Sequence, residues 1–428
     1  MTTQKTPPST VTALSAMMFL QFFIWGAWYV PVTGWLNAAK LGDLTALVFT
    51  LCPIGAIVSP LFLGMVADRF FPSQRVLGVM HLLGAAFMLA IPLVMPHVPP
   101  DTPKNILHPL ILLLLGHALC YMPTLGLSST VALQHITNPE KVFPIIRVLG
   151  TIGWIVAAFV ISGLPGEFLK SIWGGLPQGD ADIGQFYVVA GASTLLGIYS
   201  FFLPHTTPPL AGQQVSIGKL LGLDAIKLLK ERSYLIFVLC SLLICIPLAG
   251  YYAQARNYVE ATGWLKDATT TMSYGQVSEI FFMLIIPLLF VRLGVKKMLL
   301  VGMLAWVARY GLFAGAAADQ VKWMVLIGVA LHGVCYDFFF VTGQIYVDKA
   351  SPAAIRGQAQ GFFVLITQGL GMIIGAQLFG KLTAIYDRTA AGGVKDWYNI
   401  WLWPALFAAV IVVIFFLFFK EKKAAAAQ

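Results

Sequence analysis

The chain carries one long apolar segment after another, each about 20 residues or longer, and this pattern constrains the fold most. A segment of this length can cross the hydrocarbon core of a bilayer as a helix. In lipid every backbone polar group must be paired within the protein, so only helices and closed barrels span membranes. Barrel strands are shorter and alternate between apolar and polar residues. The sequence therefore predicts an all-α integral membrane protein.

The composition agrees with a lipid environment. Hydrophobic residues make up 58% of the chain and charged residues only 11%, against roughly 25% charged residues in soluble domains. The net charge of +9 does not indicate a nucleic-acid partner, because the basic residues are scattered singly over short connections. The five cysteines lie inside apolar segments without metal-ligand spacing. We therefore expect packing cysteines, no metal, no cofactor and the lipid bilayer as surroundings.

The apolar segments form about twelve spans in two sets of six. The predicted spans lie near 11–36, 44–67, 75–95, 106–133, 144–164 and 184–204, and near 233–259, 269–291, 296–317, 323–347, 355–386 and 398–419. With a cytoplasmic N-terminus, the inner connections hold about twice as many Lys and Arg residues as the outer ones, which favours both termini inside. The predicted domains are an N-terminal bundle at 1–204, a cytoplasmic linker at 205–232 and a C-terminal bundle at 233–428.

The linker carries apolar residues from Ile217 to Leu229 at helical spacing, with Lys219, Lys227 and Lys230 among them. This pattern predicts a short basic amphipathic helix on the inner membrane surface. A solvated loop helix is the alternative interpretation.

An internal repeat supports the division into two bundles. His117–Tyr121 in the fourth span matches His332–Tyr336 in the tenth, half a chain length later. Parallel repeats of six helices are a transporter architecture. The loops at 64–75 and 292–297 also resemble the inner-loop signature of the major facilitator superfamily, although Phe70, Phe71 and Pro72 replace the usual Gly and basic pair in the first copy.

Ionisable residues inside the spans are the first functional candidates, because a charge at bilayer depth is costly unless it is paired or hydrated. Glu279 shares a helix face with Gln276, where a carboxylate and an amide can bind a solute or hold a proton. Asp337 corresponds to Met122 in the repeat, so this carboxylate exists in one half only. An interhelical hydrogen bond is the alternative role for Glu279. For Arg309 we expect a structural role on the outside of the bundle.

Two stripes of polar and aromatic residues accompany these charges. Arg147, Thr151 and Trp154 share one face of the fifth span, and Gln21 and Trp25 share a face of the first. Aromatic planes beside amides suit a flat ligand that forms hydrogen bonds. Snorkelling of the arginine and interface-belt tryptophans are the alternatives. His332 and Tyr336 also share a face, with a packed core histidine as the alternative.

The sequence resembles the bacterial nucleoside:proton symporter family of the major facilitator superfamily over most of its length. The segments that carry the resemblance are 19–22 with Trp25-Gly26, 121–127, Arg147 with 150–153, 220–225, Gln276 with Ser278-Glu279, and 337–339. The resemblance implies substrate and proton roles for Arg147, Thr151, Gln276, Glu279 and Asp337. The stretch at 247–250 lacks the polar residues that span seven contributes in this family. In addition, Trp154 stands in place of a different aromatic residue, His332 in place of a Tyr, and Tyr336 in place of a Phe.

Together these observations predict a proton-coupled secondary transporter that imports nucleosides by alternating access. The predicted proton-coupling residues are Asp337, Glu279 and Arg147, and the predicted substrate-binding residues are Arg147, Thr151, Trp154, Gln276, Glu279, His332, Tyr336, Asp337, Gln21 and Trp25. We expect a monomer, in the bacterial inner membrane. Symport of another polar solute such as a sugar, and a non-transporting sensor, are the alternatives. An enzyme is not expected, because no HExxH motif and no GxSxG motif with partners is present.

Overall fold

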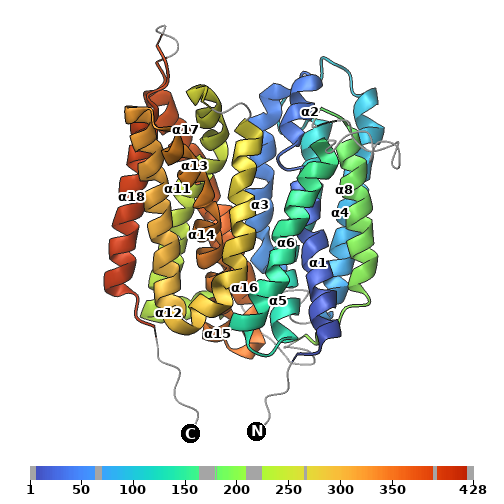
Figure 1. Ribbon diagram of the computed structural model, residues 1–428. Helices are drawn as coiled ribbons and strands as arrows, with labels where there is room; N and C mark the ends of the chain where they lie inside the picture. The colour runs from blue at the N-terminus through green and yellow to red at the C-terminus, as the bar shows by residue number, and fades with distance from the viewer. Residues whose placement is uncertain are drawn as a thin grey trace. The chain divides into compact units, whose positions relative to one another are not determined.

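The computed structural model describes residues 6–62, 70–162, 179, 181–208, 224–264, 268–388 and 393–421, and each regular element in these ranges is a helix (Figure 1). Each of the twelve predicted spans overlaps a described helix. Within the described ranges, nine helices are long and apolar enough to cross a membrane, and one of them, Tyr274–Asp319, holds two of the predicted spans. The predicted all-α class is confirmed.

The packing divides the chain into two compact units. Unit 1 comprises Met1–Asp224 and Ser351–Leu365, and unit 2 comprises Ala225–Ala350 and Ile366–Gln428. The predicted bundles differ from these units, because they assign 351–365 to the second bundle. The short helix α16 (Arg356–Val364) instead packs against α3 and α5 of unit 1. The predicted division into an N-terminal and a C-terminal bundle stays a prediction.

The long helices of unit 1 are α1 (Pro8–Gly26), α3 (Thr45–Phe62), α4 (Ser73–Val94), α5 (Pro109–Gln134), α6 (Pro139–Ser162) and α8 (Gly184–Ser200). Helix α1 packs along α6, and α4 packs along α5 and α8. The close approach of α1 and α6 requires glycine, because a Cβ atom at Gly153 would overlap the carbonyl oxygen of Phe19. Small residues at such crossings are the usual means of helix packing in membranes.

Unit 2 contains α11 (Arg232–Thr262), α12 (Ala268–Asp319), α13 (Lys322–Ala330), α14 (His332–Tyr336), α15 (Thr342–Ala350), α17 (Met372–Ile385) and α18 (Trp397–Phe418). Helix α12 is two spans joined at Gly294, whose φ of 68° lies in the region that favours glycine. The second span begins where the Val295 and Lys296 N–H groups donate to the Glu421 carboxylate, at 3.2 and 3.1 Å. The carboxylate thus satisfies backbone donors at a helix start.

Two stretches of the predicted spans are π-helical, with wider turns than an α-helix. They are η5 (Asp337–Val341), which follows α14, and η7 (Leu365–Gly371), which joins α16 to α17. Single π-helical turns inside α-helices are found frequently at functional sites. The first of them begins at a predicted site residue.

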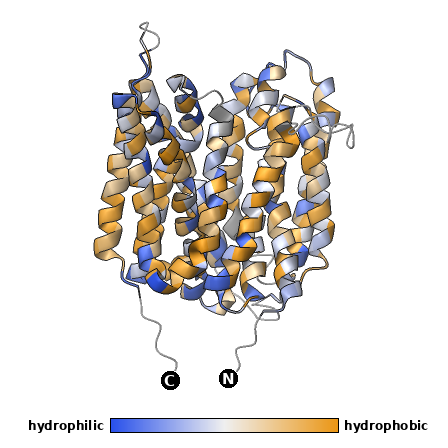
Figure 2. Cartoon of the chain, in the orientation of Figure 1, coloured by the Kyte–Doolittle hydropathy of each residue, from blue (hydrophilic) through white to orange (hydrophobic). Residues whose placement is uncertain are grey.

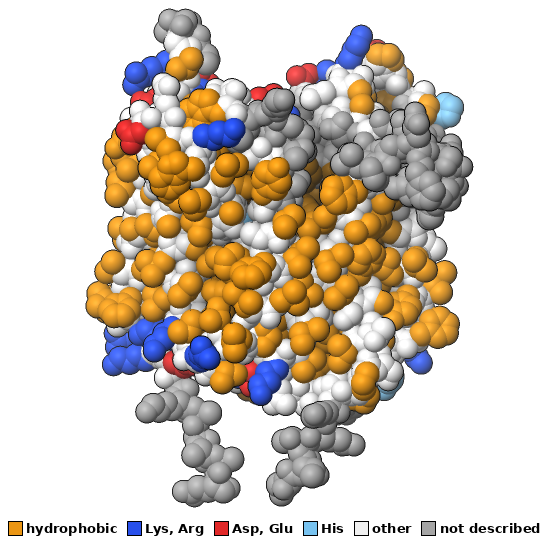
Figure 3. All heavy atoms as spheres, viewed as in Figure 1, with side chains coloured by type: hydrophobic (Ala, Val, Ile, Leu, Met, Phe, Trp, Pro, Cys, Tyr) orange, Lys and Arg blue, Asp and Glu red, His pale blue; other side chains and the backbone are white. Residues whose placement is uncertain are grey.

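The outer surfaces of the helices are apolar. Figure 2 shows hydrophobic residues along the helices and hydrophilic residues gathered toward their ends. On the face drawn in Figure 3, hydrophobic side chains cover the middle of the helices, and Lys and Arg side chains lie near the helix ends. Exposed large side chains include Phe202 at 78%, Val291 at 66% and Phe281 at 60%. Such surfaces fit contact with lipid.

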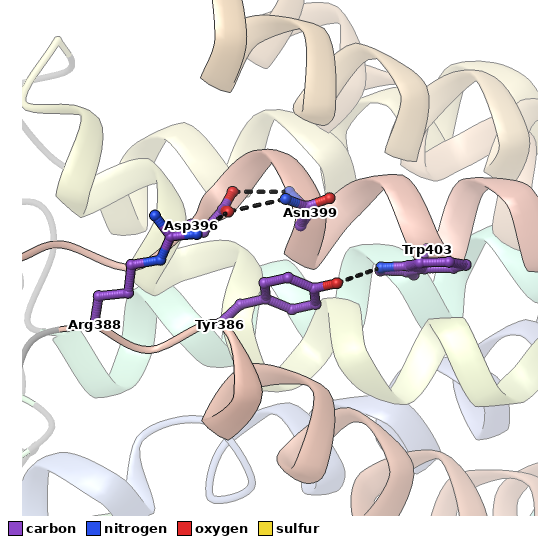
Figure 4. Close-up of polar contacts among 5 residues, drawn as sticks. All are labelled: Tyr386, Arg388, Asp396, Asn399 and Trp403. Atoms are coloured by element: carbon purple, nitrogen blue, oxygen red, sulfur yellow. Dashed lines mark hydrogen bonds and ion pairs between the residues drawn. The ribbon is translucent and has the colours of Figure 1, made fainter.

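A polar network joins the end of α17 to the start of α18 (Figure 4). The Asp396 carboxylate accepts hydrogen bonds from the backbone and side chain of Asn399, at 3.1 and 2.9 Å, and pairs with Arg388 at 3.2 Å. Trp403 donates to the Tyr386 hydroxyl at 2.8 Å. Burial by itself would raise the pKa of Asp396, but the Asn399 hydrogen bonds and the Arg388 charge outweigh it, so that pKa lies below its usual range.

The predicted amphipathic helix of the linker and the first loop motif lie mostly outside the described residues. Within the linker the structure describes 205–208 and its end, where a helical turn α10 (Asp224–Lys227) is followed by the 3₁₀ turn η4 (Leu228–Lys230). The second loop motif, 292–297, is the bend of α12 around Gly294.

Candidate functional site

A network of polar side chains lies in the interior of unit 1 and is centred on Gln21 of α1. The Gln21 side-chain nitrogen donates to the Thr124 hydroxyl at 2.7 Å, and its side-chain oxygen accepts from His81 Nε2 at 2.9 Å. Tyr121 donates to the Gln21 backbone carbonyl at 2.6 Å. Gln21 is fully buried. Both ends of its amide are therefore already engaged within unit 1, and its substrate role stays a prediction.

Arg147 of α6 lies over an aromatic ring of α1. Its guanidinium carbon is 3.7 Å from the centre of the Phe22 ring, and its side chain is buried. Gly150 leaves the room for this contact, because a Cβ atom there would lie 2.7 Å from both Arg147 and Phe22. The cation is thus held within the span against an electron-rich ring face. This position does not fit the snorkelling alternative.

Two turns beyond Arg147 on α6, Trp154 meets Trp25 of α1. The two ring centres are 5.5 Å apart in an edge-to-face arrangement, and Trp25 also lies 5.9 Å from Tyr121. Thr151, between Arg147 and Trp154 on the same helix face, is buried. The structure therefore brings the two predicted stripes of unit 1 together along the contact between α1 and α6.

In unit 2 a histidine and a carboxylate are paired inside the helices. His332 Nε2 of α14 lies 2.8 Å from Glu279 Oε1 of α12, and both side chains are buried. The helices meet closely here, since a Cβ atom at Gly333 would lie 2.7 Å from the Glu279 backbone nitrogen. The Gly333 N–H donates to the Ser278 hydroxyl at 3.0 Å. The Gly333 backbone therefore fixes the two partners beside each other.

The repeated segments give their histidines different partners. His117 stacks on Tyr121 at 5.7 Å, and its Nδ1 lies 3.1 Å from the Gly84 carbonyl oxygen. His332 has Tyr336 beside it at 5.9 Å but pairs with the Glu279 carboxylate. A backbone carbonyl only accepts a hydrogen bond, whereas a carboxylate can also bind a proton. The two repeated histidines therefore differ in their partner, a backbone carbonyl in unit 1 and a carboxylate in unit 2.

The other predicted residues of unit 2 surround this pair along the chain. Asp337 is fully buried and begins the π-helical turn η5, one residue after the half-buried Tyr336. Gln276 is half-buried and lies one turn before Glu279 on α12.

Two residues near the pair were not predicted as site residues. The Tyr251 ring of α11 stacks on His332 at 5.3 Å, and the Arg309 guanidinium lies 3.5 Å above the Tyr251 ring centre. Its sequence position suggested the outside of the bundle, but Arg309 is fully buried within unit 2. The mid-span charge was a visible signal for Arg309, whereas nothing in the sequence distinguishes Tyr251 from a core tyrosine.

Comparisons with known proteins agree with this architecture. A family model described as nucleoside H⁺ symporter matches residues 9–424. The protein YegT of Escherichia coli (strain K12) is 40% identical over 408 residues, which cover 94% of this chain and 92% of that protein. The nucleoside permease NupG of the same organism is 31% identical over 411 residues, covering 91% of each.

Solved structures show the same fold. The crystal structure of the nucleoside transporter NupG superposes with a TM-score of 0.65 at 28% identity and covers 96% of this chain and 100% of that one. The major facilitator superfamily transporter FucP superposes with a TM-score of 0.66 at 14% identity, covering 95% of this chain and 99% of that one. The predicted major facilitator fold is confirmed.

Proposed function

This chain belongs to the nucleoside H⁺ symporter family, so it is a proton-coupled nucleoside transporter, and we propose that it imports nucleosides across the bacterial inner membrane. In the proposed orientation both termini are cytoplasmic, as the distribution of Lys and Arg favours. The chain works as a monomer in this proposal. The import step uses alternating access, in which the proton gradient drives the nucleoside inward.

The observation that carries the proposed proton site is the buried pair of His332 and Glu279. His332 Nε2 and Glu279 Oε1 lie 2.8 Å apart, within hydrogen-bond distance for passing a proton between them. Both side chains are buried, so the pair is shielded from solvent. The pair therefore suits a carrier that loads a proton on one side of the membrane and releases it on the other. Asp337, which is buried in the same unit, is the second carboxylate of the coupling machinery.

Each unit, taken by itself, carries side chains that we propose as nucleoside contacts. Arg147, Thr151 and Trp154 of α6 offer a guanidinium group, a hydroxyl group and an aromatic plane, and Gln276 and Tyr336 offer an amide and a second aromatic ring. Aromatic planes stack on a nucleobase, and the amide, hydroxyl and guanidinium groups match its edges and the ribose hydroxyls. Gln21 and Trp25 support this set from α1.

Replacing Glu279 by Gln tests the proton site. The amide keeps the size of the side chain but cannot cycle a proton, so E279Q should lose at least about 90% of proton-driven uridine accumulation and keep uridine exchange within about threefold of the wild type. Asp43→Asn is the control, because Asp43 lies on an exposed connection, where it pairs with Lys104. Full accumulation by E279Q in reconstituted vesicles would remove Glu279 from the coupling mechanism.

A further inference from the structure

Five basic side chains lie at neighbouring helix ends in unit 2. They belong to the start of α11, the bend of α12 and the residues just after α18, and they form the basic patch: Arg232, Arg292, Lys296, Lys297 and Lys420. Lys296 is half-buried, and the other four are exposed. On the face drawn in Figure 3, Lys and Arg side chains lie at the bend of α12 and the lower end of α18, directly below hydrophobic side chains.

Close contacts hold these three segments together. The Ser233 hydroxyl, next to Arg232, donates to the Lys420 carbonyl oxygen at 2.7 Å, which joins the start of α11 to the end of α18. The Lys296 ammonium donates to the Phe416 carbonyl oxygen at 2.9 Å and lies 5.4 Å from the Phe416 ring centre, which joins the bend of α12 to α18. The basic patch therefore surrounds one point of unit 2, the end of α18.

Exposed cations elsewhere in the chain have carboxylate partners. Examples among the described residues are the pairs Lys104–Asp43 at 2.8 Å, Arg256–Glu260 at 3.0 Å and Arg388–Asp396 at 3.2 Å. No ion pair within the described part of the chain includes a member of the basic patch. The positive charge of the patch is therefore not neutralised in the way that these other cations are.

Two acidic residues adjoin the basic patch along the chain and do not balance it. The Glu421 carboxylate accepts hydrogen bonds from the N–H groups of Val295 and Lys296, at 3.2 and 3.1 Å, and Glu231 immediately precedes α11. Two carboxylates beside five cations leave a surplus of positive charge. Because like charges repel each other, an anion from outside the chain would stabilise this arrangement.

The helix faces next to the basic patch are apolar and exposed. Leu288 on α12 is 59% exposed, and Phe416 and Leu417 on α18 are 59% and 58% exposed. They precede Arg292 and Lys420 by four residues or fewer in the sequence. A phospholipid has the same order of groups, with a phosphate at the membrane surface and acyl chains beneath it. The combination of surplus charge and apolar surface therefore fits a lipid better than a soluble anion.

We propose that the basic patch binds the phosphate group of an anionic phospholipid, whose acyl chains lie along the exposed faces of α12 and α18. Lys296 already contacts Phe416, so the exposed Arg292, Lys297 and Lys420 are the main groups for the phosphate. In the proposed orientation the patch faces the cytoplasm, where basic clusters at the ends of spans attract anionic lipids. The site is separate from the residues proposed for the nucleoside and the proton.

Lipid retention by the purified full-length protein tests the proposal. The protein is incubated in detergent with equal amounts of phosphatidylglycerol and phosphatidylcholine that carry identical acyl chains, and native mass spectrometry counts the bound lipids. The wild type should retain phosphatidylglycerol at least about fivefold over phosphatidylcholine. The variant R292Q/K297Q/K420Q should bring this ratio below about twofold, because it removes the exposed charges and leaves Lys296 in place. The variant R292K/K297R/K420R keeps the charges and should keep the ratio.

The matched control is K40Q/K322Q/K381Q, which removes the same charge from three exposed lysines outside the basic patch and should keep the wild-type ratio. The single variants R292Q and K297Q, which should each lower the ratio about twofold, serve if the triple variant does not fold. An equal ratio of the two lipids on the wild type, an unchanged ratio in the folded patch variants, or an equal loss in the control would overturn the inference. Displacement of the retained lipid by millimolar inorganic phosphate would assign the patch to a soluble anion and also overturn it.

Discussion

Charged side chains are few in this chain, and three of the buried ones have partners that limit what they can do. Glu279 is held by His332, Arg147 by the Phe22 ring and Arg309 by Tyr251 and the Gly328 carbonyl. The aromatic rings around both arginines replace part of the water that these cations lose. The chemistry of the molecule is therefore concentrated in residues whose partners are already fixed before any solute binds.

Asp337→Asn should abolish pH-driven accumulation of nucleoside and spare exchange. The carboxylate is fully buried at the start of η5, and an amide in its place keeps the shape of the side chain but cannot cycle a proton. The measurement is radiolabelled uridine accumulation against a pH gradient, with exchange at equal pH as the control. Accumulation at the wild-type level would remove Asp337 from the proton pathway.

Single residues differed in how far the sequence could predict them. Glu279, Asp337 and Arg147 could be singled out because an ionisable group in an apolar run is costly and therefore rare. Tyr251 could not, because tyrosines are common in packed cores. The amide of Gln21 matched a ligand-binding pattern, yet its partners His81 and Thr124 come from other helices. Such long-range pairing leaves no pattern along the chain.

Helix crossings set where these residues lie, and the close contact of α1 with α6 can be tested directly. Gly153→Ala should destabilise the protein by about 1–3 kcal/mol, because the new Cβ would overlap the Phe19 carbonyl and push α6 from α1. The readout is thermal unfolding in detergent together with uridine uptake. Gly191→Ala on α8 is the matched control, since a Cβ atom there meets nothing within 4 Å. Equal stability of the two variants would contradict the tight crossing.

The connection between α17 and α18 should add a pH dependence to stability at acidic pH. The pKa of Asp396 is lower in the folded protein than the usual value of about 3.9, so its stabilising effect is complete above that value. The effect is lost as the pH falls through the folded pKa. The melting temperature of the wild type in detergent should therefore fall further between about pH 6 and pH 3 than the melting temperature of Asp396→Asn. Parallel declines would show that the network in Figure 4 adds no such stability.

At the scale of helices, hydropathy predicted the spans well because bilayer thickness sets their length. It could not predict the π-helical turns η5 and η7, since these depend on packing with neighbouring helices. Nor could it predict that α16 packs with α3 and α5, because an apolar surface does not specify its partner. The sharp bend at Gly294 was visible only as a short basic loop.

For the whole molecule, the repeat of the His-x-x-Cys-Tyr segment and the family motifs led to the fold and to the substrate class. The family model over residues 9–424 confirms that reading. The stretch at 247–250 still lacks the polar side chains expected from the family, so the choice among nucleosides depends on other residues. His332, which stands where the family has a tyrosine, is the substitution that brings an additional titratable group next to Glu279.

The most direct measurement is uptake of radiolabelled uridine and adenosine by proteoliposomes, with and without an inward proton gradient. We predict accumulation of at least one of the two above its external concentration when the gradient is present, and collapse of that accumulation after a protonophore is added. Gradient-independent equilibration, or no uptake by intact vesicles with correctly inserted protein, would contradict proton-coupled nucleoside import.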